Sequence, residues 1–335
     1  MRPFDYERAA DARAAVRAAS VPGDSHQAAP VQYLAGGTTL LDLMKLDVMR
    51  PSALVDLAGL DGALAAIEPG AGKLRIGAMA RMADVADHPD ILRDYPLLSQ
   101  SLWLAASPQI RNMARVGGNV LQRTRCAYFR DTSYAQCNKR TPGSGCAALD
   151  GHNRLHAVLG TSDHCIATYP GDFAQALIAL DASVETLGAR GPRTLRFADL
   201  HLAPGDTPHI ETNLAPGELI TAFLIPGPWR RSLYRKIRDR ESYEFALASA
   251  AVALDLDGGT VRDARIALGG VATRPWRSAE AEHLLRGRTF DEAAAHEAAE
   301  AAFAGARVHH HNAFKLPLGK ACLVRALLEA KALPA

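Results

Sequence analysis

The chain has 335 residues, enough for two or three domains with their own cores, and 48% of them are hydrophobic. Its formal net charge is +2 and no basic block stands out, so the composition gives no support for binding nucleic acid or a membrane surface. No apolar run approaches the length of a membrane span, and the N-terminus lacks the apolar core of a signal peptide. The cysteines number five, an odd count that argues against a disulfide framework.

The first half of the chain alternates short predicted helices and strands. The turn Pro69-Gly70-Ala71-Gly72 lies between two short apolar runs and predicts a hairpin. In chain order we expect a helix over 9–19, a strand over 31–34, a helix over 40–46, strands over 53–57, 64–67 and 73–79, and a helix over 92–106 that stops at Ser107-Pro108.

The second half carries a different order of elements. A turn-rich stretch near residues 200–230 marks the expected domain boundary. We expect a helix over 173–180, strands over 183–187 and 233–237, a run over 245–259 that is strand at least in part, a strand over 264–272, and helices over 291–304 and 317–333. A mixed first part followed by strands and then helices predicts an α+β fold.

Two glycine pairs are positions where a ligand can approach the backbone closely. Residues 35–39, Ala-Gly-Gly-Thr-Thr, follow an apolar strand and open a helix, where exposed amides suit a pyrophosphate. Residues 115–119, Arg-Val-Gly-Gly-Asn, follow the polar segment 107–112. Neither pair is a GxGxxG or Walker A sequence, and for an isolated pair a tight strand-to-helix turn is the favoured interpretation.

Four of the five cysteines lie within forty residues, in a segment rich in Gly, Pro, Asn and basic residues. Such a segment cannot bury enough apolar surface to fold alone, so Cys126, Cys137, Cys146 and Cys165 indicate a metal or iron–sulfur centre. Their spacing contains no CxxC pair, which makes structural zinc less favoured, and disulfides stay open as an alternative outside the cytoplasm. Cys322 lies among aliphatic residues at helical spacing and is expected to be a buried thiol.

Five motifs in order carry a family resemblance: AGGTTLLDLMK, SPQIRNMARVGGN, PGDFAQALIALDA, GELITAFLIP and YRKIRDRESYEFALASAAVAL. The chain resembles the FAD-binding subunits of the molybdenum hydroxylases, the xanthine dehydrogenase and carbon monoxide dehydrogenase family. The cysteine segment makes it most similar to flavin subunits that carry a [4Fe–4S] cluster, such as those of bacterial periplasmic aromatic-aldehyde oxidoreductases and of 4-hydroxybenzoyl-CoA reductase.

The resemblance implies two domains. Residues 1–226 would form a two-subdomain FAD-binding domain of the vanillyl-alcohol oxidase (PCMH) type, with the [4Fe–4S] loop at 123–168. Residues 227–335 would form a smaller C-terminal domain of the carbon monoxide dehydrogenase flavoprotein type.

The resemblance also implies a set of FAD contacts. The two glycine turns would wrap the diphosphate, Asp172 would accept hydrogen bonds from ribose hydroxyls, Ile220 would pack on the flavin, and Lys236 would place a charge near its pyrimidine edge. Replacing Gly36 or Gly37 with Val would then release FAD and keep the fold. The implied FAD contacts are Gln32, Tyr33, Leu34, Ala35, Gly36, Gly37, Thr38, Thr39, Leu40, Ser107, Ile110, Asn112, Arg115, Gly117, Gly118, Asn119, Asp172, Ile220 and Lys236, and the cluster ligands are the four clustered cysteines.

Arg115 departs from the family pattern, which has a small hydroxyl residue before the second glycine turn. Three roles are open for it: pairing with a flavin phosphate, guarding the ring, or facing solvent.

The function that the resemblance implies is electron transfer. Substrate would be oxidised at a molybdenum cofactor on a large subunit, and electrons would pass through [2Fe–2S] centres on a small subunit to FAD here and then to an external acceptor, all within a heterotrimer. The redox group would be the flavin, with no catalytic side chain, and neither nucleic acid nor a membrane is an expected partner. The alternatives are a stand-alone flavin oxidase of the same fold and a zinc-stapled scaffold without redox chemistry. The resemblance favours the periplasm, reached by co-export with a signal-bearing partner, over the cytoplasm.

Overall fold

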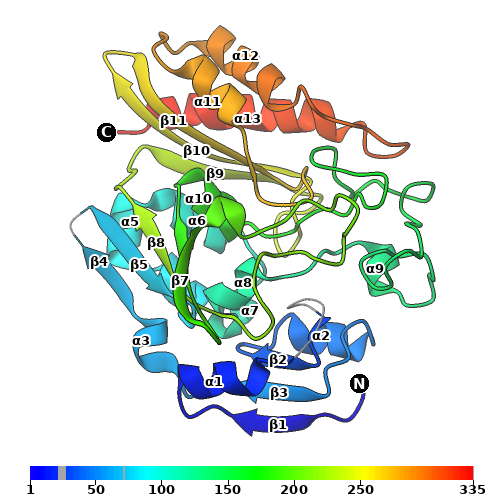
Figure 1. Ribbon diagram of the computed structural model, residues 1–335. Coiled ribbons are helices and arrows are strands. Elements are labelled where there is room, and N and C mark those ends of the chain that lie inside the picture. The colour runs from blue at the N-terminus through cyan, green and yellow to red at the C-terminus, as the bar shows by residue number, and fades with distance from the viewer. Residues whose placement is uncertain (22–27, 71, 335) are drawn as a thin grey trace.

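Three β-sheets follow one another from the bottom to the top of the molecule in Figure 1. The computed structural model describes residues 1–21, 28–70 and 72–334. Within these residues no helix is both long enough and apolar enough to cross a membrane.

The lowest sheet is parallel and has the strand order β1-β3-β2. Its strands are β1 (Asp5–Arg8), β2 (Val31–Leu34) and β3 (Ala53–Asp56), with helices α1 (Ala12–Ala19) and α2 (Leu40–Lys45) beside them. The Asp11 carboxylate accepts a hydrogen bond from the Ala14 amide at 2.7 Å and caps α1. The predicted helix over 9–19 therefore begins later than expected, and β1 was missed because all four of its residues are exposed and show no apolar alternation.

The middle sheet is antiparallel, with the order β4-β5-β8-β6-β7. Its strands are β4 (Ile67–Gly70), β5 (Lys73–Gly77), β6 (Ser183–Gly188), β7 (Gly191–Arg196) and β8 (Leu219–Pro226). The predicted β4–β5 hairpin is present, although Ala71 of its turn lies outside the described residues. The strand expected over 64–67 is wrong at its start, because Asp61–Ala65 forms the short helix α3.

Short helices lie between the strands of this sheet in the chain, and all but α9, which belongs to the cysteine-containing segment, lie near it. They are α4 (Met82–Ala86), α5 (Pro89–Asp94), α6 (Pro96–Trp103), α7 (Pro108–Met113), α8 (Val116–Val120), α9 (Ala127–Arg130), α10 (Phe173–Ala179) and the 3-10 turn η2 (Phe197–Asp199). The single helix predicted over 92–106 is wrong, because α5 and α6 are separate. Pro96 has no amide to continue the ladder, and Tyr95 before it is non-helical with φ −139° and ψ 52°.

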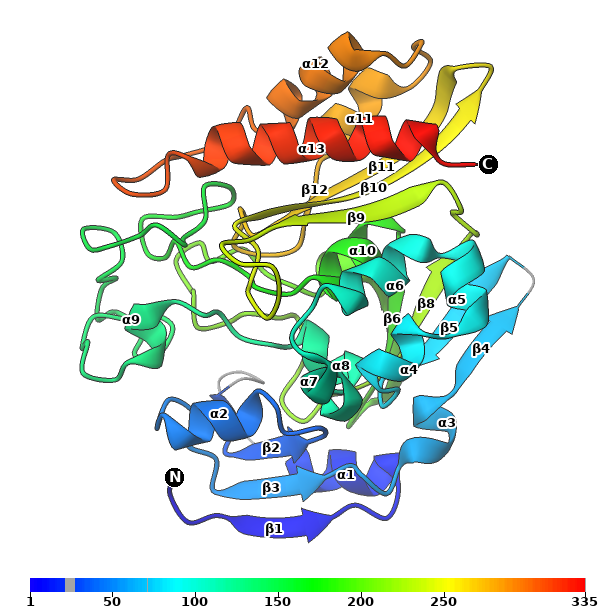
Figure 2. The ribbon, with the colours of Figure 1, turned by 180° about the vertical axis from the view of Figure 1, so that it is seen from behind.

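The top sheet has the order β12-β11-β10-β9, with all its pairs antiparallel. Its strands are β9 (Ser232–Ile237), β10 (Ala248–Asp257), β11 (Thr260–Gly269) and β12 (Trp276–Arg277). Helices α11 (Ala279–Leu285), α12 (Glu292–Ala302) and α13 (Lys315–Ala332) lie above it, and α6 and α10 contact it from below (Figures 1 and 2). The predicted strand within 245–259 and the two closing helices are therefore confirmed.

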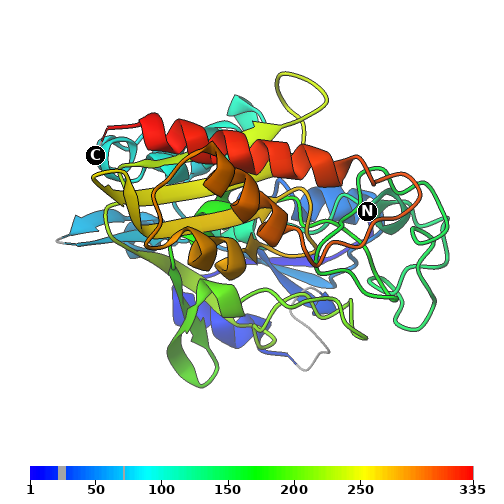
Figure 3. The same cartoon turned by 90° about the horizontal axis from the view of Figure 1, so that it is seen from above.

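Viewed from above, α13 runs along the top sheet, and the cysteine-containing segment extends to one side as a long irregular excursion (Figure 3). A small apolar cluster of Leu43, Phe129 and Cys137 anchors that excursion to α2. The excursion is thus tied to the N-terminal sheet by a contact between residues more than eighty positions apart.

Candidate functional site

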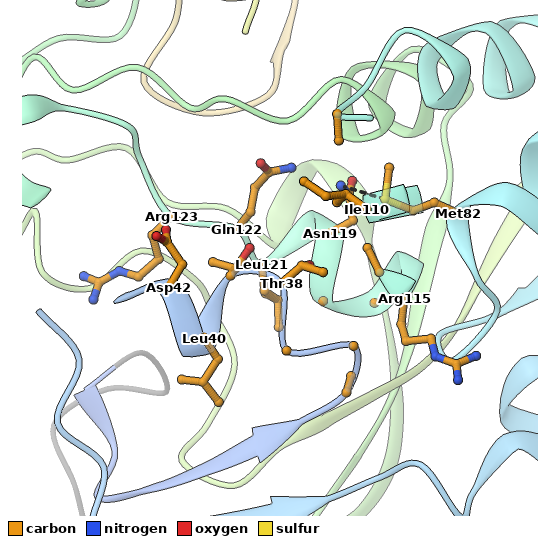
Figure 4. A pocket seen from close by; sticks show the side chains of 18 of the residues that line it. Thr38, Leu40, Asp42, Met82, Ile110, Arg115, Asn119, Leu121, Gln122 and Arg123 are labelled. Carbon is orange, nitrogen blue, oxygen red and sulfur yellow. Dashed lines mark hydrogen bonds between the residues drawn. The ribbon is translucent and has the colours of Figure 1, made fainter. Parts of the chain in front are cut away.

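A cavity of 560 Å³ lies where the lowest sheet, the middle sheet and the top sheet meet. We call it the large cavity. Its walls come from the turn after β2 and from α7 and α8, which Figure 4 shows. The start of β8 and the β9–β10 connection complete them. This volume is typical of a site for a drug-sized molecule or cofactor.

Three of the four turn glycines are required by the protein itself, two by close packing and one by its backbone conformation. A Cβ on Gly36 would lie 2.2 Å from the Met113 carbonyl oxygen, and one on Gly117 would lie 2.8 Å from the Ala78 Cβ. Gly37 has φ +72°, a left-handed conformation that side chains avoid. A side chain at Gly36 or Gly37 would therefore strain the protein itself, so loss of FAD in these Val variants would not isolate a ligand contact.

Gly118 differs from these three glycines. It lines the large cavity, and a Cβ built on it meets no described atom within 4 Å. A side chain at Gly118 would therefore extend into the large cavity without clashing with the described protein atoms.

Most of the implied FAD contacts meet at this cavity. The residues that line it are Gln32, Tyr33, Ala35, Gly36, Gly37, Thr38, Thr39, Leu40, Ile110, Arg115, Gly117, Gly118, Asn119, Asp172 and Ile220. Four implied contacts do not line it: Leu34, Ser107, Asn112 and Lys236. Of these, Ser107 caps α7 by accepting a hydrogen bond from the Ile110 amide at 3.3 Å, and Asn112 is exposed on that helix.

Asp172 and Lys236 form a buried ion pair behind the cavity wall. Lys236 Nζ lies 2.8 Å from Asp172 Oδ2 and donates to the Leu104 carbonyl at 3.0 Å. The Tyr234 hydroxyl lies 2.7 Å from Asp172 Oδ1, so both carboxylate oxygens have partners from β9. Lys236 thus reaches the cavity only through Asp172, an intramolecular role that the sequence does not reveal.

Arg115 is held inside the protein and is 13% exposed. Its guanidinium donates to the Met79 carbonyl at 2.8 Å and lies 3.5 Å from Asp61 Oδ2. The solvent-facing role is therefore wrong, while the two ligand-facing roles stay predictions.

Two buried polar atoms on the cavity wall have no hydrogen-bond partner among the described residues: Asn119 Oδ1 and Arg125 Nε. The Asn119 amide nitrogen makes a 3.4 Å contact with Met82 Sδ, drawn in Figure 4. Unpaired buried polar atoms are costly, so these two mark places where a polar ligand would hydrogen-bond.

A positive wall that the sequence did not reveal lies at the α2 end of the large cavity. Arg125 and Arg130 share the single carboxylate of Asp42, at 3.3 and 2.7 Å, which leaves one uncompensated positive charge. Burial lowers the pKa of Arg125, and its guanidinium lies 4.9 Å from the centre of the Phe245 ring. The arginines of RTRCAYFR are evident in the sequence, but the direction in which their side chains point depends on the contact with Asp42 of α2.

The β9–β10 connection adds Arg240, Tyr243, Glu244 and Phe245 to the cavity wall. Tyr243 is half exposed and has φ +53°, an uncommon conformation for a bulky residue. These residues were quoted within a family motif, but no ligand contact was assigned to them.

The four clustered cysteines line one small enclosed space, the cysteine cavity. All four are free thiols, and Cys137 and Cys146 face each other as a backbone bridge pair. Burial raises the pKa of Cys126 to about 12, whereas a hydrogen bond with Cys165 lowers the pKa of Cys146. Cys322 lies on the buried face of α13, apart from the four clustered cysteines, and is a buried thiol as predicted.

The thiols surround this space without meeting at one point. Among the described residues, no group of three or more His, Cys, Asp or Glu side chains has the geometry of a metal-ion site. His156, which was not predicted, places Nε2 3.1 Å from Cys126 Sγ. Four thiols around a shared space are the donor set of a [4Fe–4S] cluster, whose ligands bind different irons.

Comparison with known proteins agrees with this architecture. Residues 2–228 match the FAD binding domain in molybdopterin dehydrogenase, and residues 232–330 match the CO dehydrogenase flavoprotein C-terminal domain. The chain is 48% identical to the aldehyde oxidoreductase FAD-binding subunit PaoB of Escherichia coli, over 99% of both chains. It is 29% identical to the carbon monoxide dehydrogenase medium chain of Afipia carboxidovorans, over 87% of this chain and 82% of that one.

Solved structures give the same result. The carbon monoxide dehydrogenase of Hydrogenophaga pseudoflava superposes with a TM-score of 0.77 at 26% identity, covering 100% of this chain and 99% of that chain. The quinoline 2-oxidoreductase of Pseudomonas putida superposes with a TM-score of 0.74 at 26% identity, covering 98% and 97%.

The fold and the large cavity define an FAD-binding oxidoreductase subunit with an α+β architecture. The chain belongs to the family of FAD-binding medium subunits of aldehyde oxidoreductases and other molybdenum hydroxylases.

Proposed function

We propose that this chain transfers electrons in a molybdenum-dependent aldehyde oxidoreductase, using FAD in the large cavity and a [4Fe–4S] cluster in the cysteine cavity. The observation that carries the proposal is the pairing of these two cavities in one chain, joined by residues 121–126. The aldehyde class rests on the 48% identity to a subunit named for aldehyde oxidation.

The residues of the large cavity fit FAD. The turns 35–39 and 117–119 offer backbone amides to a diphosphate, and the Arg125–Arg130 pair supplies a positive wall. Asn119 Oδ1 and Arg125 Nε offer the unpaired polar atoms noted above. When bound, FAD supplies the redox chemistry, and the protein supplies position and electrostatics.

Asp172 would orient a ribose of the cofactor, and Ile220 would pack against its flavin ring. Asp172 is fixed by Lys236 and Tyr234, so its carboxylate faces the large cavity in one orientation. Ile220 is buried on β8 and presents an apolar surface to the same space. Lys236 would affect the flavin in two ways: by holding Asp172 in place and by the electrostatic effect of its positive charge behind the cavity wall.

The cysteine cavity fits a [4Fe–4S] cluster by its donor set. Cys126, Cys137, Cys146 and Cys165 come from scattered positions of one irregular segment, as cluster ligands often do. Nearby cations, among them Lys139 on the cavity wall, would offset the negative charge of four thiolates.

We propose that the substrate is oxidised on another chain of the assembly. Several relatives are named medium chain or medium subunit, as in carbon monoxide dehydrogenase and nicotine 6-hydroxylase. A large molybdenum subunit and a small [2Fe–2S] subunit would complete a heterotrimer, and an external acceptor would take the electrons. Assembly before export would place it in the periplasm, which fractionation of tagged cells would test.

The test is a comparison of the isolated chain with the assembled complex. The isolated chain should show flavin absorption bands with a broad iron–sulfur shoulder, and it should not oxidise an aromatic aldehyde with an artificial acceptor. Activity should return when the molybdenum and [2Fe–2S] subunits are added. Turnover by the isolated chain at the rate of the complex would instead identify a stand-alone oxidase, and a colourless chain would identify a scaffold.

A further inference from the structure

One buried carboxylate, Glu211, pairs with two basic side chains that line different cavities. Arg123 places its guanidinium against both Glu211 oxygens at 3.1 to 3.3 Å. Lys139 Nζ lies 2.9 Å from Glu211 Oε1 and donates to the Pro208 carbonyl at 3.0 Å. All three side chains are largely buried, with exposed fractions of 8%, 14% and 12% for Arg123, Glu211 and Lys139.

The two cations face the two cofactor sites proposed above. Arg123 lines the large cavity, where Figure 4 labels it, and Lys139 lines the cysteine cavity. Glu211 itself lines a cavity of 30 Å³ between them, which also touches Leu121 and Cys165. Glu211 is thus the ionised group that contacts one basic residue from each wall.

The charges in this group do not cancel. Two cations and one anion leave one positive charge buried between the sites. Arg123 also lies 4.6 Å from the centre of the Phe129 ring, which holds its guanidinium in place. Because burial weakens solvent screening, each of these charges acts strongly on neighbouring groups.

We propose that Glu211 is a positioning residue that sets the reduction potentials of both redox sites together, by compensating Arg123 on the flavin side and Lys139 on the cluster side. This inference rests on the proposed function and deepens it. The cluster gains one negative charge on reduction, and so does a flavin that is reduced to its anionic form. A neighbouring carboxylate therefore disfavours reduction, and removing its charge raises both potentials.

The test is a redox titration of the assembled complex that carries Glu211→Gln. The flavin is followed by absorption and the cluster by electron paramagnetic resonance. Both midpoint potentials should rise, while iron and FAD contents stay at the wild-type level. Lys139→Gln should lower the cluster potential more than the flavin potential, and Arg123→Gln should do the reverse.

A double variant separates charge from structure. Glu211→Gln with Lys139→Gln again leaves one positive charge, so the potentials should return towards the wild-type values. Glu211→Asp keeps the charge and should also stay near wild type. The matched control is Glu282→Gln, which removes a buried carboxylate paired with Arg277 that lines neither cavity and should leave both potentials unchanged.

Unchanged potentials in Glu211→Gln would overturn the inference. Equal shifts in Glu211→Gln and Glu211→Asp would also overturn it. In either case Glu211 would have a structural role and its charge would not set the potentials. If Glu211→Gln loses its cofactors, the two single cation variants decide by the sign of their shifts. A wild-type complex without iron in this chain would refute the cluster proposal, while the flavin potential alone would still decide the role of Glu211.

Discussion

Lys236 Nζ lies 2.8 Å from Asp172 Oδ2, and the two side chains are 1% and 5% exposed. The pair joins β9 of the top sheet to the start of α10, so the C-terminal domain helps to build the floor of the large cavity. Tyr234 on the same strand holds the other carboxylate oxygen. The two domains are therefore coupled at the site itself.

Breaking this pair should destabilise the protein strongly. Lys236→Met leaves the Asp172 carboxylate buried without its cation, which costs about 3–5 kcal/mol. Urea unfolding of the FAD-free chain measures the loss, and Asp172→Asn combined with Lys236→Met should cost less than the sum of the single changes. The exposed pair Arg262–Asp255 is the control, since solvent screens this pair and Arg262→Gln should cost far less than Lys236→Met. Equal costs at the two pairs would contradict the buried role.

Gly118 and Gly36 should respond to side chains in opposite ways. Gly118→Val should reduce FAD occupancy with the fold intact, because its side chain would enter the large cavity and meet no described protein atom within 4 Å of its Cβ. Gly36→Ala should lower the free energy of unfolding by about 1–3 kcal/mol, because its Cβ meets the Met113 carbonyl.

Flavin absorbance per chain and thermal unfolding separate the two effects. Gly305→Val is the matched control, since its Cβ also meets no described atom but the residue lines neither cavity. Full FAD occupancy in Gly118→Val would show that the bound cofactor does not lie against Gly118.

Each cysteine of the cysteine cavity should be needed for iron. Replacing any one of Cys126, Cys137, Cys146 or Cys165 by Ala should remove about four irons per chain, because the cluster loses a ligand. Cys322→Ala should leave iron unchanged, since Cys322 is buried on α13 and does not line the cysteine cavity. Iron analysis of the five purified variants is the measurement, and the same iron content in all five would show that the ligands are wrongly assigned.

His201 should make the folded protein sensitive to mild acid. Its Nε2 lies 2.8 Å from the Val120 carbonyl at the end of α8, and burial lowers its pKa from 6.5 to about 4. Between these values the unfolded chain binds a proton at this residue that the folded protein does not. Its contribution to stability is therefore complete above pH 6.5 and falls by about 1.4 kcal/mol per unit as the pH drops towards 4.

His201→Gln should remove that slope while an amide still donates to Val120. The measurement is the free energy of unfolding in urea at several values between pH 7 and pH 5. An unchanged pH slope in His201→Gln would show that His201 is not protonated differently in the two states.

Local sequence patterns predicted much of the secondary structure and the glycine turns. The strands at 31–34 and 183–187 and the helix at 173–180 appear at their expected places because their apolar spacing and flanking turns are local signals. The pattern failed where local signals are absent or misleading, as in exposed β1 and in the helix that Pro96 divides. Of the nineteen FAD contacts that the family motifs implied, fifteen line one cavity.

Three features of the site depend on contacts between distant parts of the chain. Gly36 is fixed by the backbone of Met113, Asp172 by a lysine on β9, and Glu211 by cations more than seventy and eighty positions earlier. Sequence by itself determined the class of elements, the cysteine set and the family, because residue type and short-range spacing decide those. Only the tertiary structure decided which glycine faces the ligand and which charges are neighbours, because burial and electrostatic pairing depend on distances that the chain order does not contain.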